Sequence, residues 1–280
     1  MNIIEILKVL VFGIVEGFTE WLPISSTGHM ILLDEIIPLT VSKDFKDMIE
    51  VVIQLGAILA VVVLYFHKLN PFSPSKTDGQ KRATIRLWSK IIVACVPVAV
   101  VGLLVNDWME AHLMNSYVVS SMLILYGLLF IAIEIWNQDK KPIVEKTGQI
   151  SYQMAFCIGL IQLLSLVPGT SRSGVTILGA MLLGCSRGIS AEFTFFLGIP
   201  VMFGASGLKL VKFFLSQGSF TGTEVFYLIF GMVVAFVVSV YSIKFLMGYI
   251  RKNSFSVFGI YRIVLGVIVL GYFGISKLLA

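Results

Sequence analysis

Charged side chains are scarce in this 280-residue chain. Asp, Glu, Lys and Arg make up 13% of the residues, whereas 57% are hydrophobic. A soluble domain carries about a quarter charged residues, so this composition excludes an ordinary water-soluble fold and places the chain in a lipid bilayer. The net charge of +5 calls for no nucleic acid, because the basic residues gather in loops between apolar segments, as membrane orientation requires.

Cysteine and histidine are also rare, with three of each. Cys95, Cys157 and Cys185 stand far apart in apolar surroundings, which argues against a disulfide framework or a zinc knuckle. A cleavable signal peptide is not expected either, because the first residues lack a basic start and a small-residue cleavage site and Glu5 interrupts them early.

Long apolar runs, in contrast, are abundant. A membrane-spanning helix needs about 20 mostly apolar residues, and six candidate segments are found at 49–66, 91–105, 117–136, 191–208, 225–243 and 258–275. Two further apolar regions contain polar motifs and are broken by Gly and Pro. The predicted fold class is an all-α polytopic membrane protein with six transmembrane helices and two pairs of re-entrant, broken helices.

The two polar motifs form an internal repeat. "GIVEGFTEWLPISSTGH" (13–29) aligns with "GLIQLLSLVPGTSRSGV" (159–175) at a shift of 146 residues (159 − 13). Further on, "EVVIQLG" (50–56) matches "EFTFFLG" (192–198) in the separation of its Glu and Gly. We therefore predict a single integral membrane domain, 1–280, made of one repeat half at about 1–136, a cytoplasmic linker at about 137–150 and a second half at about 151–280.

The loop charges orient these halves. The loops at 67–90 and 137–152 are rich in Lys and Arg, whereas 106–116 has none, so the positive-inside rule places the first two in the cytoplasm and the third outside. Each half then has three spans, and an odd number gives the halves opposite topology, as in the inverted repeats of transporters. The first motif should dip in from outside and the second from inside. Irregular backbone at that depth needs protein or water around it, so the two motifs should meet in the core.

Two carboxylates open the first motif, "EGFTEWLPISSTGH". Glu16 and Glu20 are four residues apart and share a helix face, where they repel each other. The pair is sensible if a cation lies between them, or if one is protonated and works as an acid or a base. The alternative is that Glu16 and Glu20 are solvated charges at the end of a helix and have no chemical role.

Hydroxyl groups follow these acids. Pro23 should end the helix, and Gly28 allows a close or left-handed backbone. The residues between and after them supply hydroxyls, amides and an imidazole: Ser25, Ser26, Thr27 and His29. A histidine beside hydroxyls and acids is a candidate acid, base or nucleophile.

The second motif, "PGTSRSG", has no carboxylate. Arg172 stands among Thr170, Ser171 and Ser173 and is flanked by glycines. A guanidinium with hydroxyls and glycine-flanked amides suits a phosphate group. The two motifs together predict one site for phosphoryl transfer. The structural alternative is that Arg172 pairs with an acid of the first motif only to hold the halves together.

At these residues the chain resembles a known family. "EGFTEWLPISSTGH", "EVVIQLGAILAV" and "PGTSRSG" are similar to the signature segments of the undecaprenyl-pyrophosphate phosphatases of the bacitracin-resistance type. The resemblance implies a bacterial plasma-membrane enzyme that hydrolyses the terminal phosphate of the polyprenyl pyrophosphate carrier, recycles it for cell-wall synthesis and confers bacitracin resistance. It also implies a divalent cation, Mg²⁺ or Ca²⁺, and the catalytic residues Glu16, Glu20, Ser26, His29 and Arg172.

The residue chemistry assigns the following roles. Ser26 attacks the terminal phosphorus or positions a water, and His29 activates the nucleophile, protonates the leaving group or is itself the nucleophile. Glu20, with Glu16, acts as a base or holds the cation. Arg172 binds the diphosphate, and the other expected contacts to it are Ser25, Thr27, Gly28, Gln54, Thr170, Ser171 and Ser173. Because the first motif dips from outside, hydrolysis is expected on the outer side of the membrane.

Other functions fit the sequence less well. "SSTGH" is similar to the Ser-Gly-His segment of acid-phosphatase-type lipid phosphatases, but their later histidine would fall on Leu178 or Phe193. An intramembrane serine protease is suggested by "GASG" at 204–207, yet no histidine follows His112. A transporter or flippase of the polyprenyl phosphate carrier is the alternative from another class. A homodimer is compatible with the sequence, which does not give the oligomeric state.

Overall fold

The computed structural model describes residues 2–279, apart from the side chains of 106, 110 and 276–279. In this part of the chain every regular element is a helix, and one isolated bridge joins Val144 to Cys185. The elements are α1 (Ile3–Thr19), α2 (Ser26–Ile36), α3 (Lys43–Val52), α4 (Gln54–Leu64), α5 (Phe66–Leu69), α6 (Asp78–Leu113), α7 (Ser116–Trp136), η1 (Thr147–Gln149), α8 (Tyr152–Gln162), η2 (Leu163–Leu166), α9 (Arg172–Leu182), α10 (Arg187–Gln217), α11 (Gly222–Tyr249) and α12 (Ser256–Leu279).

Six helical stretches of the described chain are long and apolar enough to cross a membrane. All six predicted spans overlap them, so the prediction of an all-α, multi-pass membrane protein is confirmed. The stretches are Lys43–Leu64, which joins α3 and α4, and Asp78–Val105, Ser116–Trp136, Arg187–Gln217, Gly222–Tyr249 and Ser256–Ile275.

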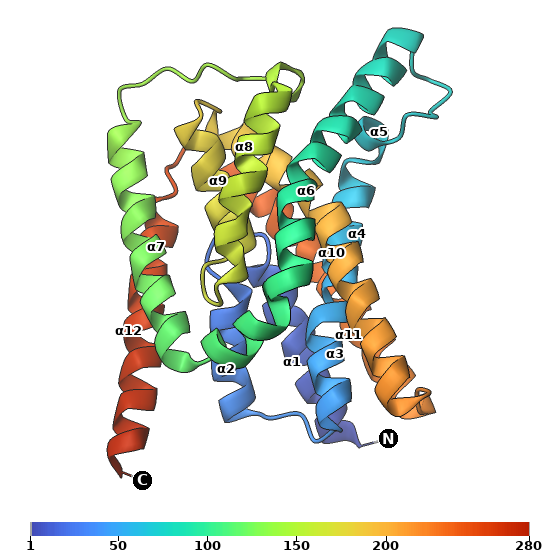
Figure 1. Cartoon of the computed structure of the whole chain (residues 1–280), viewed down its shortest axis with the longest axis vertical. Coiled ribbons are helices and arrows are strands. Elements are labelled where there is room, and N and C mark those ends of the chain that lie inside the picture. Colours follow the sequence, from blue (N-terminus) through green and yellow to red (C-terminus); the bar gives the residue numbers. More distant parts are fainter. Residues whose placement is uncertain (1, 280) are drawn as a thin grey trace.

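The two broken segments enter the protein from opposite faces. In Figure 1, α1 rises from the lower face and α2 returns to it, whereas α8 descends from the upper face and α9 returns upward. The chain reverses direction at 20–25 in the first pair and at 163–171 in the second. Pro23 ends α1 as expected: it has no N–H to bond the carbonyl of Thr19, four residues earlier, and Thr19 is the last helical residue.

The first helix of each broken pair packs against a long helix of the other half. The first broken helix, α1, packs against α11, and its counterpart α8 packs against α6, while α7 and α12 pair with each other. The matching glycines explain why the backbones come so close. A Cβ on Gly13 would lie 3.0 Å from the carbonyl oxygen of Gly231, and one on Gly159 would lie 2.2 Å from that of Ala94. The residue limits of the halves and the linker stay predictions.

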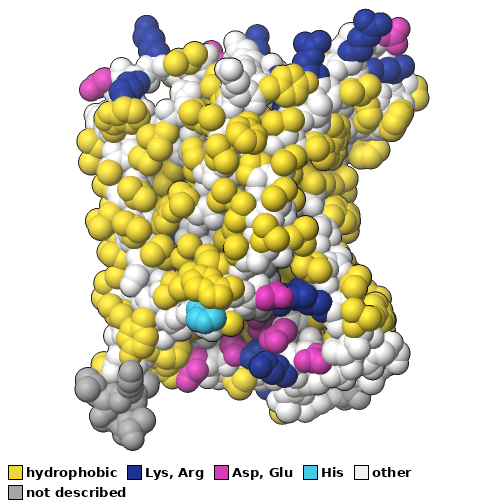
Figure 2. Space-filling model, in the orientation of Figure 1, with side chains coloured by type: hydrophobic (Ala, Val, Ile, Leu, Met, Phe, Trp, Pro, Cys, Tyr) yellow, Lys and Arg dark blue, Asp and Glu magenta, His cyan; other side chains and the backbone are white. Residues whose placement is uncertain are grey.

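The two ends of the molecule differ in charge. We call the upper end in Figures 1 and 2 the basic face, formed by the loops at 70–77, 137–146 and 251–255, and the lower end the site face, formed by 37–42, 114–115 and 218–221. Figure 2 shows Lys and Arg along the basic face, a wide hydrophobic belt below it, and acidic side chains gathered with Lys or Arg near the site face. This distribution suits a chain that crosses a bilayer between the two faces.

Candidate active site

Each motif loop ends on a serine with a left-handed backbone. Ser25 has φ 72° and ψ 98°, and Ser171 has φ 69° and ψ 116°. They are the two non-glycine residues with positive φ in the described chain. In both, Oγ accepts a hydrogen bond from the N–H of the glycine three residues on, at 3.4 Å for Gly28 and 3.1 Å for Gly174. Such a backbone is unfavourable for serine, and the two motif loops share it at the same shift of 146 residues.

The two loops meet on one carboxylate. Arg172 Nη2 donates to Oε1 of Glu20 at 2.8 Å, and Ser26 Oγ donates to Oε2 at 3.1 Å. Ser173 Oγ donates to the backbone carbonyl of Glu20 at 3.0 Å, and Arg172 Nη1 also donates to the carbonyl of Thr194 at 3.3 Å. The structure thus brings together the acid and serine of the first motif and the arginine of the second.

A cavity of about 350 Å³ on the site face reaches Ser26. Leu166 and Pro168 of the second loop form part of its wall. Most of its remaining lining is polar and comes from α1 to α3, with additions from α4 and α10: Glu16, Ser26, Thr27, Asp34, Lys46, Asp47, Glu50, Gln54 and Lys209. A polar cavity that ends on a hydroxyl is suited to a charged head group.

Glu20 and Glu16 differ in how many of their carboxylate oxygens accept hydrogen bonds. Both oxygens of Glu20 accept hydrogen bonds, whereas Oε1 of the buried Glu16 has no hydrogen-bond partner. Glu50 lines the same cavity as Glu16. No group of three or more His, Cys, Asp and Glu is preformed for a metal within the described residues. Glu16 and Glu50 thus line the cavity and Glu20 does not, and the predicted metal pair of Glu16 and Glu20 stays a prediction.

His29 is turned away from the cavity. Its Nδ1 lies 2.8 Å from the carbonyl oxygen of Ser25, and because a carbonyl only accepts, Nδ1 carries the proton. Its Nε2 lies 2.7 Å from the hydroxyl of Tyr261 on α12 and accepts from it in the neutral ring. Ser26 and Thr27 line the cavity and His29 does not. The structure therefore does not bring His29 to the predicted nucleophile, and its catalytic role stays a prediction.

The other predicted binding residues divide into two groups. Thr27 and Gln54 lie on the cavity wall. The remainder shape the loops: Ser25 and Ser171 cap helices, Gly28 packs against Leu123, where a Cβ would meet Cδ1 at 3.0 Å, Thr170 is buried, and Ser173 bonds the carbonyl of Glu20.

Three residues near the site escaped prediction as site residues. The sequence identifies Glu50 only as part of the repeat. Tyr261 and Arg262 lie inside the predicted span 258–275, and Arg262 is fully buried, with hydrogen bonds to carbonyls of both loops. The signal was present, because an arginine within an apolar span points to function by default.

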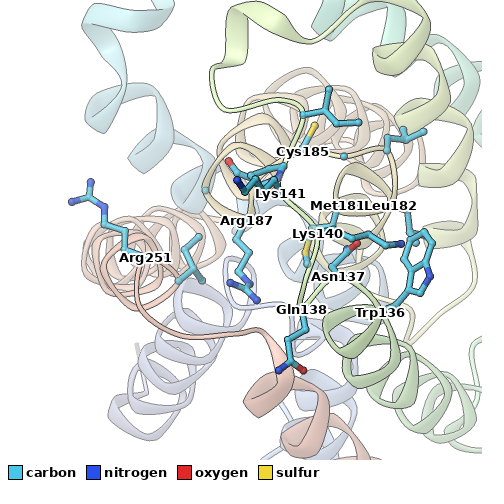
Figure 3. A pocket seen from close by; sticks show the side chains of 17 residues that line it. Trp136, Asn137, Gln138, Lys140, Lys141, Met181, Leu182, Cys185, Arg187 and Arg251 are labelled. Atoms are coloured by element: carbon cyan, nitrogen blue, oxygen red, sulfur yellow. The ribbon is translucent and has the colours of Figure 1, made fainter.

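A second cavity, of about 530 Å³, lies on the basic face (Figure 3). Its cations are Lys140, Lys141, Arg187 and Arg251, and Arg187 is already paired with the buried Glu134 at 2.9 Å. No residue of either motif loop lines it. It is therefore not the candidate active site.

Comparison with known proteins covers nearly the whole chain. Residues 9–268 match the family model described as "Bacitracin resistance protein BacA". Among curated relatives, the undecaprenyl-diphosphatase of Streptococcus thermophilus (strain ATCC BAA-250 / LMG 18311) is 57% identical over 277 residues, 99% of this chain and 96% of the relative. That of Enterococcus faecalis is 57% identical over 265 residues, 95% of this chain and 96% of the relative. That of Desulfitobacterium hafniense is 60% identical over 274 residues, 98% of each.

Proposed function

The chain belongs to the BacA family of bacitracin resistance proteins, and we propose that it is a membrane-embedded phosphatase that hydrolyses undecaprenyl diphosphate to the monophosphate and inorganic phosphate. The observation that carries this proposal is the pair of hydrogen bonds that Glu20 accepts, one from Ser26 on the wall of the polar cavity and one from Arg172 of the second motif. The transporter alternative is not favoured, because an anion carrier needs no hydroxyl paired with a carboxylate.

In this mechanism Arg172 binds either Glu20 or the diphosphate of the substrate, but not both at once. Without substrate its guanidinium binds Glu20 at 2.8 Å. A diphosphate offers the same fork more negative oxygens, so substrate binding takes Arg172 away from the carboxylate. The Glu20 carboxylate is then free to accept a proton, because Arg172 no longer occupies its Oε1.

Ser26 is the group next to the released carboxylate. Its Oγ lies 3.1 Å from Glu20 Oε2, within reach for general base catalysis. Either Ser26 loses its proton to Glu20 and attacks the terminal phosphorus, or it positions a water that does so. The new P–O bond forms as the bridging P–O bond breaks, and undecaprenyl phosphate leaves. If Ser26 attacks, water releases the bound phosphate in a second step.

A divalent cation would complete the charge balance. When bound, Mg²⁺ or Ca²⁺ neutralises phosphate oxygens and favours charge development on the leaving group. Glu16, whose Oε1 has no hydrogen-bond partner, lines the same cavity as Glu50, and these two carboxylates would hold the ion.

An apolar groove provides room for the lipid chain. A cavity of about 360 Å³ between α6 and α10 is lined by small and aliphatic residues, among them Gly102, Gly204 and Pro200. Leu166 lines both this groove and the polar cavity. We assign the first isoprene units of the substrate to the groove, with the rest of the chain in the bilayer.

We place the polar cavity on the outer side of the bacterial plasma membrane. The supporting observation is that Lys and Arg crowd the opposite, basic face (Figure 2), which the positive-inside rule assigns to the cytoplasm. Lys46 and Lys209 on the cavity wall run against the rule, and both stand among carboxylates there.

The test is phosphate release by purified protein in detergent with undecaprenyl diphosphate, with and without divalent cation. We expect release that requires the cation and is lost in Ser26→Ala if the serine attacks. Ser89→Ala is the matched control, because Ser89 bonds Tyr152 far from the cavity and should keep full activity. No release by the parent protein, together with movement of the lipid across vesicle membranes, would replace the phosphatase with a transporter. A phosphohistidine trapped on His29 would make that residue the nucleophile.

A further inference from the structure

Arg262 of α12 connects the two motif loops. Its Nη1 donates to the carbonyl of Pro23 at 3.3 Å, and its Nη2 donates to the carbonyls of Gly169 and Thr170, both at 2.9 Å. Pro23 precedes Ser26 by three residues, and Thr170 precedes Arg172 by two. One guanidinium thus holds the backbone immediately before the reactive residue of each loop.

Arg262 is also an unpaired buried charge. Its side chain is fully buried in a membrane-spanning helix, and in the part of the chain that the structure describes it forms no ion pair. Its guanidinium carbon lies 5.7 Å from the ring centre of Tyr126, and Nε has no hydrogen-bond partner. Burying such a charge is unfavourable, so its hydrogen bonds to the loop carbonyls must offset that cost.

The charges around the site give a reason for a cation at this position. Arg172 is neutralised by Glu20, and Glu16 adds another carboxylate beside them. Carboxylates also outnumber Lys46 and Lys209 on the cavity wall, so a further positive charge favours binding of a diphosphate. Arg262 lies next to the first turn of α9, since a Cβ on Gly174 would come 3.3 Å from its Nη1. Its field therefore acts where Arg172 must meet the anion.

We propose that Arg262 is a positioning residue: it fixes the two loops relative to each other so that Ser26 and Arg172 address the same phosphate group. The inference rests on the proposed function for its kinetic part only. The planar fork is needed because three carbonyls from two loops converge on one side chain, which a lysine ammonium cannot match in geometry.

The kinetic test compares Arg262→Lys and Arg262→Met with two control variants, Arg187→Lys and Arg187→Met. Arg187 also bonds a buried partner, Glu134, but at the basic face. We expect kcat for undecaprenyl diphosphate to fall about ten-fold in Arg262→Lys, with KM within about three-fold, because the charge stays while the loops shift. Arg262→Met should lose about a hundred-fold in kcat and also raise KM. The Arg187 variants should lower the melting temperature and leave kcat within about two-fold.

A second measurement does not depend on activity. The chain has four tryptophans, and Trp21, in the first loop, is fully buried and packs edge-on against Phe195 at 5.2 Å. In a background with Trp88, Trp108 and Trp136 changed to Phe, the emission of Trp21 should shift to longer wavelength in Arg262→Met and stay unchanged in Arg187→Met.

These measurements separate the two proposals. An inactive parent protein overturns the proposed function, while the Trp21 emission still tests whether Arg262 holds the loops. Parental kcat or parental Trp21 emission in Arg262→Met overturns the positioning role. So does a loss of kcat that merely follows the loss of melting temperature to the same extent as in the Arg187 variants. If Arg262→Met does not fold, Arg262→Lys is judged by the same criteria.

Discussion

The helices α2 and α9 are built alike and carry different chemistry. Each has 11 residues and follows a left-handed serine whose hydroxyl accepts from a glycine amide. The first helix begins with Ser26, which contacts Glu20, and the second begins with Arg172. The shared part is the backbone and its cap, and the divergent part is the side chain at the first helical position. A duplicated scaffold has thus become two complementary halves of one site.

The next pair of equivalent residues shows how the two faces came to differ. On the basic face Glu192 is bound by Lys68 and Thr147. On the site face Glu50 lines an open cavity together with Lys209. The same position therefore closes one face with an ion pair and leaves the other face accessible to a ligand.

The largest effect should come from the residue that joins the halves. Glu20→Gln keeps the size of the side chain but removes the charge that binds Arg172 and accepts the Ser26 proton, so phosphate release should fall about a thousand-fold. The measurement is kcat on undecaprenyl diphosphate, with the exposed Glu145→Gln as the control. Activity within ten-fold of the parent would exclude Glu20 as the base.

Arg172→Lys should have the next largest effect. Lysine keeps the positive charge and loses the two-pronged donor geometry, so kcat/KM should fall about a hundred-fold. Arg187→Lys, which changes the arginine at the start of α10 instead, should retain kcat/KM. Equal losses in both variants would mean that Arg172 serves packing alone.

Glu50 and Glu192 provide a direct comparison of the two faces. Glu50→Gln should lower activity about ten-fold at low divalent cation, with partial recovery at higher concentration, because a ligand of the ion is lost. Glu192→Gln should leave the cation dependence unchanged and reduce stability by about 2 kcal/mol, since two hydrogen bonds to a charged group are weakened. The reverse pattern in a cation titration would contradict the assignment of the open face.

The serine caps should give the smallest effect. Ser25→Ala and Ser171→Ala each remove the hydrogen bond from a glycine amide, which should contribute about 1 kcal/mol to the unfolding free energy. Ser171→Ala also removes the hydrogen bond between Ser171 Oγ and Ser173 Oγ at 3.2 Å. Because the two caps share one geometry, the losses should agree within about 0.5 kcal/mol when both are measured in a Ser173→Ala background, by denaturant unfolding in detergent. A several-fold difference would show that the two turns are not equivalent.

Hydropathy and spacing were sufficient for much of this architecture. The six spans follow from apolar length, and the meeting of the loops follows from the repeat and the loop charges, because both are properties of the chain read in order. The direction of a side chain around its helix is not such a property. His29 turns toward Tyr261, which lies 232 residues later, and nothing near His29 in the sequence indicates this partner.

Arg262 was missed for a different reason. Its charge within the apolar span 258–275 is visible in the sequence, but a charge alone does not identify the groups that it contacts. Its contacts are to backbone carbonyls of Pro23, Gly169 and Thr170, and carbonyl acceptors have no sequence signature. The positive φ of Ser25 and Ser171 could not be predicted from the sequence either, because the glycine three residues later is the only local indication of such a turn.

The most direct test of the account is a structure of the protein with a non-hydrolysable undecaprenyl diphosphate analogue. We predict that the Arg172 guanidinium leaves Glu20 and that both it and Ser26 Oγ lie within about 3.5 Å of oxygens of the terminal phosphate. A diphosphate bound instead in the basic-face cavity beside Lys140, Lys141 and Arg187, with Arg172 still on Glu20, would contradict the account.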